Sequence, residues 1–531
     1  MLRMKTWRIL LSMVLAIGSI SLMTAFRFPA KEPHSLHVQL LGINDFHGQL
    51  DKTNMVDGKP VGTAAVLAAY LKKREQENPN TLLVQAGDMV GASAPVSALL
   101  QDEPTIRILN ALGFDAGTIG NHEFDEGIPE MMRLIYGGYH EKTGDFEGAS
   151  FPYTCANVLD KQTHQPILPP YTIKRVKGIP IGFIGVVSRT TPSIVISDHV
   201  KDVEFIDEAT AVNRWVKVLK QKGVHTIIVL AHEGGNQNRD TGKIEGPIAD
   251  IARKIDPEVD VIFAGHTHTY LNGTVAGKLI VQAYSYGTAF SDVDLTIDPR
   301  SKDVTSKHGE IVTTYQEGIK PDPQVAKMVA EAEKKVGPLI NQVIGKTAAA
   351  ITRTQNEAGE SALGNLIADA QRSAMNTDFA FMNPGGIRAD LPAGDVTWGD
   401  LYTTQPFGNQ LEKMELTGEQ IKQLLNQQFQ DPDRVHMLQI SGLKYRWDPS
   451  RPADDRIVSM TGADGTPIDL NQTYTVTTNN FLASGGDRFT VFTGGKNVVI
   501  GPTDLDALIQ YIKQLPQPFH AEIEGRIQSA P

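Results

Sequence analysis

The sequence predicts an α/β protein, because strand-like and helix-like segments alternate from residue 36 to residue 300. Short apolar runs such as 82–86 alternate there with longer amphipathic stretches, which is the βαβ pattern. A second observation supports the same class: polar side chains follow several of the apolar runs directly. In open α/β sheets the loops at the carboxyl ends of the strands line the functional crevice. The chain has 531 residues, which is enough for two or three domains.

The predicted elements can be placed in chain order. We expect helices at 63–77, 209–222 and 363–375, and two strands within 171–187 joined by a turn at Lys177-Gly178. Asp322-Pro323 is a helix-start signal. The charged stretch that follows, 322–344, is expected to be a helix that connects two domains and belongs to the core of neither. Mixed helices and strands are expected from there to residue 530.

The N-terminus resembles a secretory signal. Arg3, Lys5 and Arg8 precede the apolar run 9–25, as the basic and apolar regions of a signal peptide do. An uncleaved anchor is the alternative, since roughly 18 apolar residues can just span a bilayer. In both cases we expect an exported protein that works in the periplasm, at the cell surface or outside the cell, with membrane contact only through an uncleaved N-terminal segment. The predicted division is 1–25 signal or anchor, 36–318 first domain, 319–345 linker helix and 346–530 second domain.

Charge and cysteine content exclude some partners. The net charge is −11 without long blocks of one sign, whereas binding of a nucleic-acid polymer favours a basic face. The single cysteine, Cys155, allows no intramolecular disulfide and is interpreted as a small buried hydrophobe. The sequence gives no indication of the oligomeric state.

Five short segments place metal-ligand side chains at the ends of apolar runs. They carry Asp45 and His47, Asp88, Asn121 and His122, His232, and His266 with His268. Together, Asp, Asn and His form the ligand set of a two-metal hydrolase. Taken singly, each is as well explained by a turn, a helix cap or a structural histidine. Five such coincidences favour the metal interpretation, and the absence of cysteine ligands disfavours a structural zinc site.

Spacing within these segments suggests individual roles. Asp45 and His47 are two residues apart, as are His266 and His268, and in extended backbone such residues project to the same side. The two oxygens of the Asp88 carboxylate can bridge two cations. We assign His122 a different role, which is to protonate the leaving oxygen or to stabilise charge on the phosphoryl group. Asp125, three residues later, is expected to orient the His122 imidazole.

Two of these segments, LLGINDFHGQL and FDAGTIGNHEFD, resemble the signature segments of the secreted 5′-nucleotidases, a branch of the calcineurin-like metallophosphoesterases. The likeness extends over essentially the whole chain after the N-terminal segment. It implies an N-terminal calcineurin-like metallophosphoesterase sandwich and a C-terminal α/β substrate-binding domain. It also implies His122 and Asp125 as the catalytic pair. The implied ligand sets are Asp45, His47, Asp88 and His268 for one metal and Asp88, Asn121, His232 and His266 for the other.

The segments NPGGIRADL, QPFGNQL and NNFLASGGDRF resemble the substrate-binding segments of the same family. The implied substrate residues are Asn383, Gly386, Arg388, Phe407, Phe481 and Asp487, with Arg353 as a further phosphate-binding arginine despite extra spacing before Gly364. Two aromatic rings can clamp a flat base, a carboxylate can accept hydrogen bonds from ribose hydroxyls, and an arginine fork can bind phosphate. The alternative is that Phe407 and Phe481 are core residues and 485–487 only a hairpin turn.

The resemblance therefore implies an exported enzyme with two divalent ions (Zn, Mn, Co or Fe) that hydrolyses nucleoside 5′-monophosphates to nucleoside and phosphate. The same centre would serve a 2′,3′-cyclic-nucleotide phosphodiesterase or a UDP-sugar hydrolase, and the sequence does not separate these activities. A surface nucleotide-binding protein is the non-enzyme alternative, and the complete ligand set favours the enzyme. Because the metals and the base clamp are expected on different domains, we also expect domain closure during catalysis.

Overall fold

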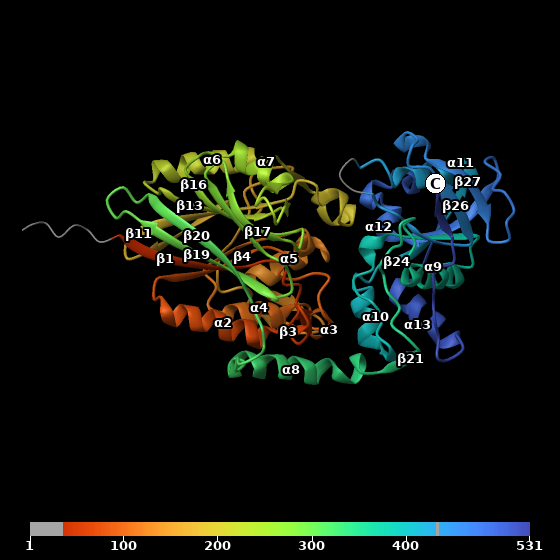
Figure 1. Ribbon diagram of the computed structural model, residues 1–531, viewed down its shortest axis with the longest axis horizontal. Helices are drawn as coiled ribbons and strands as arrows, with labels where there is room; N and C mark the ends of the chain where they lie inside the picture. Colours follow the sequence, from red (N-terminus) through yellow and green to blue (C-terminus); the bar gives the residue numbers. More distant parts are fainter. Residues whose placement is uncertain (1–34, 432–434, 531) are drawn as a thin grey trace, which may run out of the picture.

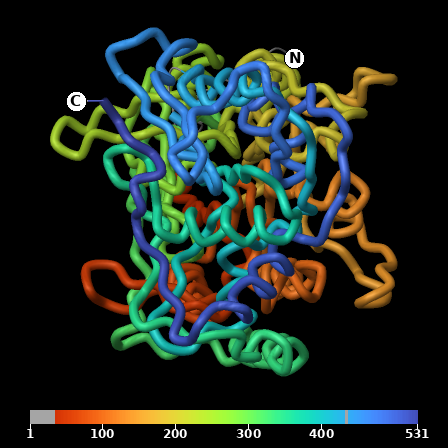
Figure 2. The backbone as a smooth tube through the Cα atoms, turned by 90° about the vertical axis from the view of Figure 1, so that its right-hand side faces the viewer, coloured from red at the N-terminus to blue at the C-terminus, as the bar shows by residue number. Residues whose placement is uncertain are grey.

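The computed structural model describes residues 35–431 and 435–530, so the predicted signal or anchor lies outside the described residues. Two bodies lie side by side along the long axis, and helix α8 (Pro323–Ile340) runs beneath the first toward the second (Figure 1). Viewed along that axis, the C-terminal body lies in front of the N-terminal one, with α8 along the lower edge (Figure 2). Within the described ranges, no helix is both long enough and apolar enough to cross a bilayer.

The N-terminal body is a sandwich of two six-stranded sheets. The first sheet has the order β20 (Val304–Thr313), β19 (Ala289–Ile297), β1 (Leu36–Ile43), β4 (Thr81–Ala86), β5 (Ala116–Thr118) and β8 (Tyr153–Thr154). The second has the order β10 (Tyr171–Val176), β11 (Ile179–Val187), β13 (Thr226–His232), β16 (Val259–Ala264), β18 (Lys278–Ala283) and β17 (Tyr270–Val275). Side chains alternate across the strands, so Leu40 faces the space between the sheets while Leu41 faces the helices outside.

Helices cover both outer faces of the sandwich. Those on the first sheet are α2 (Ala64–Glu77), α3 (Pro95–Ala98), α4 (Glu103–Leu112) and α5 (Gly127–Tyr136), and those on the second are α6 (Glu208–Gln221) and α7 (Pro247–Lys254). The Thr63 hydroxyl caps α2 by accepting the N–H of Val66, and Asp207 caps α6 in the same way. The helices predicted at 63–77 and 209–222 and the strand pair predicted at 171–187 thus agree with the structure to within a residue or two.

The expectation that the connecting helix belongs to neither core is wrong. Val325, Val329, Ala332 and Val336 lie on one stripe of α8 and are buried in the same hydrophobic cluster as α2 and α4. The helix also ends at Ile340 instead of residue 344, and strand β21 (Val343–Thr347) begins three residues after that end. Charged residues on the other faces of α8 conceal this stripe in the sequence.

The C-terminal body is a second α/β unit. Its five-stranded sheet has the order β25 (Gln439–Ser441), β22 (Phe379–Met382), β28 (Thr473–Asn479), β24 (Gln410–Thr417) and β29 (Lys496–Thr503). The packing helices are α9 (Ala362–Met375), α11 (Gly418–Gln427) and α13 (Asp504–Gln514). A three-stranded sheet, β27 (Ile457–Gly462), β26 (Leu443–Trp447) and β30 (Ile527–Ser529), lies beside it. The short helices α10 (Trp398–Thr404) and α12 (Asn480–Ala483) lie on the side facing the N-terminal body (Figure 1).

Strand register brings the candidate segments to one edge of the sandwich. β1, β4 and β5 are parallel neighbours in the first sheet, with Ile43 opposite Gln85 and Ala86 opposite Thr118. β13 and β16 are parallel neighbours in the second sheet, with Ala231 opposite Ala264. The loops after these five strands therefore leave the sandwich at the same end, which is the place expected for a functional crevice in an α/β sheet.

Candidate metal centre and substrate cleft

The candidate metal ligands lie at or just beyond these strand ends, in tight turns. The backbone angle φ is 48° at Asp45, 50° at His47, 53° at Asp88, 71° at His266 and 53° at His268. Left-handed backbone is uncommon for residues other than glycine and costs on the order of 1–3 kcal/mol each. The expectation of extended backbone at the D-x-H and H-x-H pairs is therefore wrong. Left-handed turns bring Asp45 and His47 into one group of ligand atoms, and they place His266 and His268 in two different groups.

One group of ligand atoms consists of Asp45, His47 and His268. Nε2 of His268 lies 3.3 Å from Oδ1 of Asp45 and 3.3 Å from Nε2 of His47. Nδ1 of His47 donates to the carbonyl oxygen of Gly91 at 2.7 Å. This bond fixes the tautomer of His47 and leaves the lone pair of Nε2 free for a cation. In metal proteins, backbone carbonyls commonly accept the second ring N–H of a histidine ligand in this way.

The second group consists of Asp88, His232, His266 and Asn121. Nε2 of His232 lies 3.0 Å from Oδ2 of Asp88 and 3.2 Å from Oδ1 of Asn121. Oδ1 of Asn121 lies 2.9 Å from Nδ1 of His266. Nδ1 of His232 donates to the carbonyl oxygen of Ala86 at 2.9 Å, which again leaves Nε2 as the ligand atom.

Asp88 lies between the two groups. Its Oδ2 is 3.0 Å from Nε2 of His232 and 3.8 Å from Nε2 of His47, which belongs to the other group. Asp45, His47 and His232 have no exposed surface, and Asp88 is 1 % exposed. Buried carboxylates among imidazoles without a thiolate form a donor set that suits Zn, Mn, Co or Fe, so the residues present fit a divalent-metal centre.

The electrostatics favour the ligating protonation states of Asp88 and His47, whereas at His232 they favour a proton in the position that a cation would take. Burial raises the pKa of Asp88, but the neighbouring His232 and His122 outweigh burial and hold this pKa well below its usual range. Burial lowers the pKa of His47 well below its usual value and keeps its imidazole neutral. Burial also lowers the pKa of His232, but the Asp88 carboxylate outweighs burial and raises this pKa to about 10. The field of the carboxylates thus attracts positive charge to this position.

His122 begins the 3₁₀ turn η1 (His122–Phe124) and pairs with Asp125. Nδ1 of His122 lies 2.8 Å from Oδ2 of Asp125, and the backbone N–H of His122 donates to Oδ1 of Asp88 at 2.9 Å. Burial lowers the pKa of His122, but Asp125 and Asp88 outweigh burial and raise it above its usual value. A positioned, partly protonated imidazole beside a metal centre can act as a general acid.

Glu123 has a structural role that its sequence position does not reveal. The side chain is 6 % exposed, and its carboxylate accepts the backbone N–H groups of Asp88 at 3.0 Å, Met89 at 2.9 Å and Gly120. Glu123 thus joins the loop that carries Asp88 to the loop that carries Asn121. In the sequence, Glu123 resembles a solvated surface acid, because nothing local signals these three contacts.

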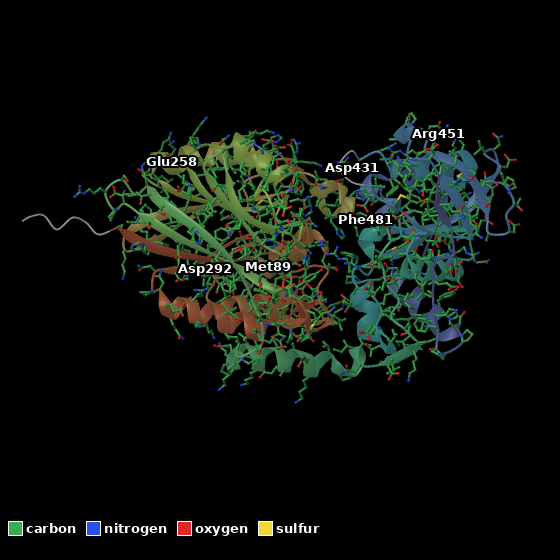
Figure 3. All side chains as sticks on the ribbon, viewed as in Figure 1. Met89, Glu258, Asp292, Asp431, Arg451 and Phe481 are labelled. Carbon is green, nitrogen blue, oxygen red and sulfur yellow. The ribbon has the colours of Figure 1, made fainter. Side chains whose placement is uncertain are left out.

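The predicted substrate residues meet the metal ligands in one cleft of about 540 Å³ between the two bodies. Those on its walls are Arg353, Asn383, Gly386, Arg388, Phe407, Phe481 and Asp487. Phe481 is labelled in Figure 3 on the side of the C-terminal body that faces the N-terminal one. Nη1 of Arg353 donates to the carbonyl oxygen of Ile387 at 2.9 Å, which holds the Arg353 side chain near Arg388 despite the extra spacing.

Both candidate clamp aromatics are half-buried at the cleft wall, and Phe481 also packs against the hydrophobic core of the C-terminal body. The Phe407 ring stacks on His122 with centroids 5.8 Å apart and an angle of 19°, and the Arg388 guanidinium lies 5.9 Å from the Phe407 centroid. Nδ2 of Asn383 donates to Oδ2 of Asp487 at 3.4 Å. Phe407 therefore lies directly beside His122, with Arg388 next to it.

Other residues on the cleft wall were not anticipated from the sequence. Tyr286 packs edge-on against His47 and His268, with centroids 5.7 and 5.3 Å apart. Ile194, Val195 and Ile196 form an apolar part of the wall. No ligand-type side chain or glycine pattern distinguishes these positions in the sequence, so only the three-dimensional arrangement reveals them.

Comparisons with known proteins agree over both bodies. A model of the calcineurin-like phosphoesterases matches residues 38–270, and a model of the 5′-nucleotidase C-terminal domain matches residues 343–494. The chain is 45% identical over 507 residues to Endonuclease YhcR of Bacillus subtilis, an alignment that covers 93% of this chain but only 41% of that protein. It is 38% identical over 557 residues to Cell wall protein Lmo0130 of Listeria monocytogenes, covering 96% and 71%. The crystal structure of a 5′-nucleotidase precursor from Thermus thermophilus superposes with a TM-score of 0.80 at 29% identity, covering 93% and 99%.

Proposed function

Because the chain belongs to the 5′-nucleotidase family of calcineurin-like phosphoesterases and is a metal-dependent phosphoester hydrolase, we propose that it hydrolyses nucleoside 5′-monophosphates to nucleoside and phosphate. One observation carries the proposal. Two groups of candidate metal ligands, with Asp88 between them, open into the same cleft as the arginines and aromatic rings of the C-terminal body.

We propose two divalent ions. Asp45, His47, His268 and Asp88 would hold one of them, and Asp88, Asn121, His232 and His266 would hold the other. The chemistry that such a pair supplies is neutralisation of charge on the phosphoryl oxygens and a water made nucleophilic at neutral pH. The Asp88 carboxylate would belong to both ligand sets, because it lies within 4 Å of an imidazole from each group.

His122 would donate a proton to the 5′ oxygen of the nucleoside as the bond between phosphorus and that oxygen breaks. Asp125 accepts the Nδ1 proton of His122 and so presents the opposite ring nitrogen for this transfer. The raised pKa of His122 keeps a protonated fraction available near neutral pH. The nucleoside would thus depart as a neutral alcohol and not as an alkoxide, which is a poor leaving group.

The C-terminal body would bind the nucleotide. Phe407 and Phe481 would stack on the base, which suits any base because every base has a π-face. Asp487 would accept hydrogen bonds from the ribose hydroxyls, and Arg353 and Arg388, with Asn383 and Gly386 beside them, would bind the phosphate. This arrangement places the base on one body and the reacting phosphoryl group on the other.

We also propose that the enzyme acts outside the cytoplasmic membrane. The basic and apolar N-terminal pattern supports this location, as does similarity to a cell wall protein. Fractionation of expressing cells, with and without residues 1–25, tests it. Retention of the full-length protein in the cytoplasm would contradict it.

A substrate panel tests the activity. Protein stripped of metal and supplied with Mn²⁺ should release phosphate from AMP faster than it cleaves 2′,3′-cyclic AMP or UDP-glucose. Single-stranded and double-stranded DNA belong in the panel, because one relative is an endonuclease. The net charge of −11 disfavours such polymers here. Fast cleavage of DNA or cyclic AMP without phosphate release from AMP would overturn the proposed substrate.

A further inference from the structure

Residues 191–200 of the N-terminal body form one wall of the substrate cleft. This segment, which we call the 191–200 segment, follows β11 and contains two 3₁₀ turns, η2 (Thr191–Ser193) and η3 (Ser197–Val200). Figure 1 shows it in yellow, extending from the N-terminal body to α12. It borders the cleft through Ile194, Val195 and Ile196.

The 191–200 segment contacts the C-terminal body next to the candidate nucleoside site. The Ser197 hydroxyl donates to the carbonyl oxygen of Ser484 at 3.3 Å. η2 also packs against η6 (Gly486–Arg488), the turn that carries Asp487. The wall is therefore held directly beside the residues proposed to bind ribose.

Its other end is anchored on the catalytic turn. Nδ1 of His199 lies 3.3 Å from the carbonyl oxygen of Phe124, the last residue of η1, and donates to it. Val195 is 3 % exposed and packs in the hydrophobic core of the N-terminal body. Val195 and His199 therefore anchor the 191–200 segment to the N-terminal body.

The side chains that face the cleft are apolar. Ile194 and Ile196 are half-buried, and Phe407 and Phe481 border the same cleft from the C-terminal body. Isoleucine side chains donate and accept no hydrogen bonds, so they can cover a flat base without selecting one base over another. Apolar surface removed from water contributes about 25 cal/mol per Å², and a phosphate ester without a base has no such surface to place there.

We propose that Ile194 and Ile196 form the N-terminal wall of the nucleoside site and give the enzyme a preference for nucleotides over phosphate esters that lack a base. This inference rests on the proposed 5′-nucleotidase activity. It adds to the two stacking rings a third contact surface, contributed by the body that carries the metal ligands. The base is then recognised by both bodies at once.

The test compares AMP with ribose 5-phosphate, which has the same 5′ ester and sugar but no base. In the double variant Ile194→Ala/Ile196→Ala, the ratio of kcat/KM for AMP to kcat/KM for ribose 5-phosphate should fall roughly ten-fold or more, since missing hydrophobic contacts in a pocket commonly cost that much. Ile311→Ala is the matched control: Ile311 is a partly buried isoleucine of β20 that packs between the sheets, and its loss should leave the ratio unchanged.

Calorimetry gives a readout that does not depend on turnover. Adenosine should bind the metal-free double variant with a Kd roughly ten-fold higher than that of the parent. Ile194→Val/Ile196→Val keeps most of the packing and should give a smaller change of the same sign, which guards against a misfolded alanine variant.

An unchanged ratio together with unchanged adenosine binding would overturn the inference. An equal fall in kcat/KM for both substrates would also overturn it, because the segment would then only support η1 through His199. These failures are distinct from failure of the proposed function, which would appear as a parent enzyme that releases no phosphate from AMP.

Discussion

Replacing Glu123 with alanine should destabilise the turns that carry the metal ligands. The carboxylate accepts three backbone N–H groups, those of Asp88, Met89 and Gly120, at a site where Glu123 is 6 % exposed. Each buried donor left without an acceptor costs about 1–3 kcal/mol. Three donors therefore predict an apparent loss of about 3–9 kcal/mol, and water that fills the space would bring the loss toward the lower end.

The same substitution should weaken metal binding. Asp88 supplies the carboxylate between the two ligand groups, and Glu123 holds its backbone N–H. Loss of a residue that orients a metal ligand typically costs about 10–100-fold in affinity. Glu123→Gln keeps one acceptor oxygen but turns an amide NH₂ toward backbone donors, so this variant should fall between the parent and Glu123→Ala in both measurements.

Urea unfolding followed by circular dichroism and Mn²⁺ titration of the metal-free protein by calorimetry measure the two effects. Glu126→Ala is the matched control, because Glu126 is an exposed acid beside the same turn and its loss should change stability by no more than about 0.5 kcal/mol. A Glu123→Ala variant whose free energy of unfolding lies within about 0.5 kcal/mol of that of the parent, and which binds Mn²⁺ with the parental affinity, would contradict the proposed role of Glu123.

Three further predictions concern single residues. His122→Ala should lower kcat by roughly 10²–10⁴-fold, while elemental analysis should find the same metal content as in the parent. Loss of a metal ion from this variant would instead indicate that His122 is a metal ligand. Phe407→Ala should mainly raise KM for AMP, by about 5–150-fold, because stacking on a base contributes about 1–3 kcal/mol. Steady-state kinetics that show an unchanged KM would contradict the stacking role. Burial raises the pKa of Asp260 from 3.8 to about 7, so the folded protein binds this proton more tightly than the unfolded chain and stability is lost as pH rises through that range. Asp260→Asn avoids that loss, so the unfolding free energy of the variant should rise relative to that of the parent by roughly 1–4 kcal/mol between about pH 4.5 and pH 8. A difference between variant and parent that is the same at both pH values would refute the raised pKa of Asp260.

The place of the site could be predicted because it depends on two local signals that coincide. Apolar runs such as those before Asp88 and His232 indicate buried parallel strands, and the carboxyl ends of such strands meet at one edge. Polar residues at those ends must therefore lie near one another, independently of the conformation of the rest of the chain. The structure places both side chains there, 3.0 Å apart.

The local conformation could not be predicted in the same way. Asp45 and His47 meet their partners through left-handed backbone, which is strained for residues with side chains. Such strain persists only because the surrounding structure holds it, for example through the bond from the backbone N–H of His266 to Oδ1 of Asp45 at 2.9 Å. A contact between residues more than two hundred positions apart leaves no trace in the local sequence.

The packing of α8 and the role of Glu123 were missed for a related reason. The buried stripe that includes Val325 and Val336 is narrow, and lysines and glutamates cover the other faces of the helix, so the segment resembles an exposed connector. Glu123 resembles a surface acid because two of its three partners, Asp88 and Met89, belong to a turn more than thirty residues away. Side-chain chemistry indicates what a residue can do, but only tertiary contacts decide whether it is buried.

We propose that Asp88 joins two cations in one cleft. Electron paramagnetic resonance of Mn²⁺ added stepwise to metal-free protein tests this most directly, because two ions about 3.5–4 Å apart give an exchange-coupled spectrum. We expect a coupled pair at two equivalents per chain in the parent and no coupling in Asp88→Asn. Saturation at one ion, or two ions without coupling in the parent, would contradict it.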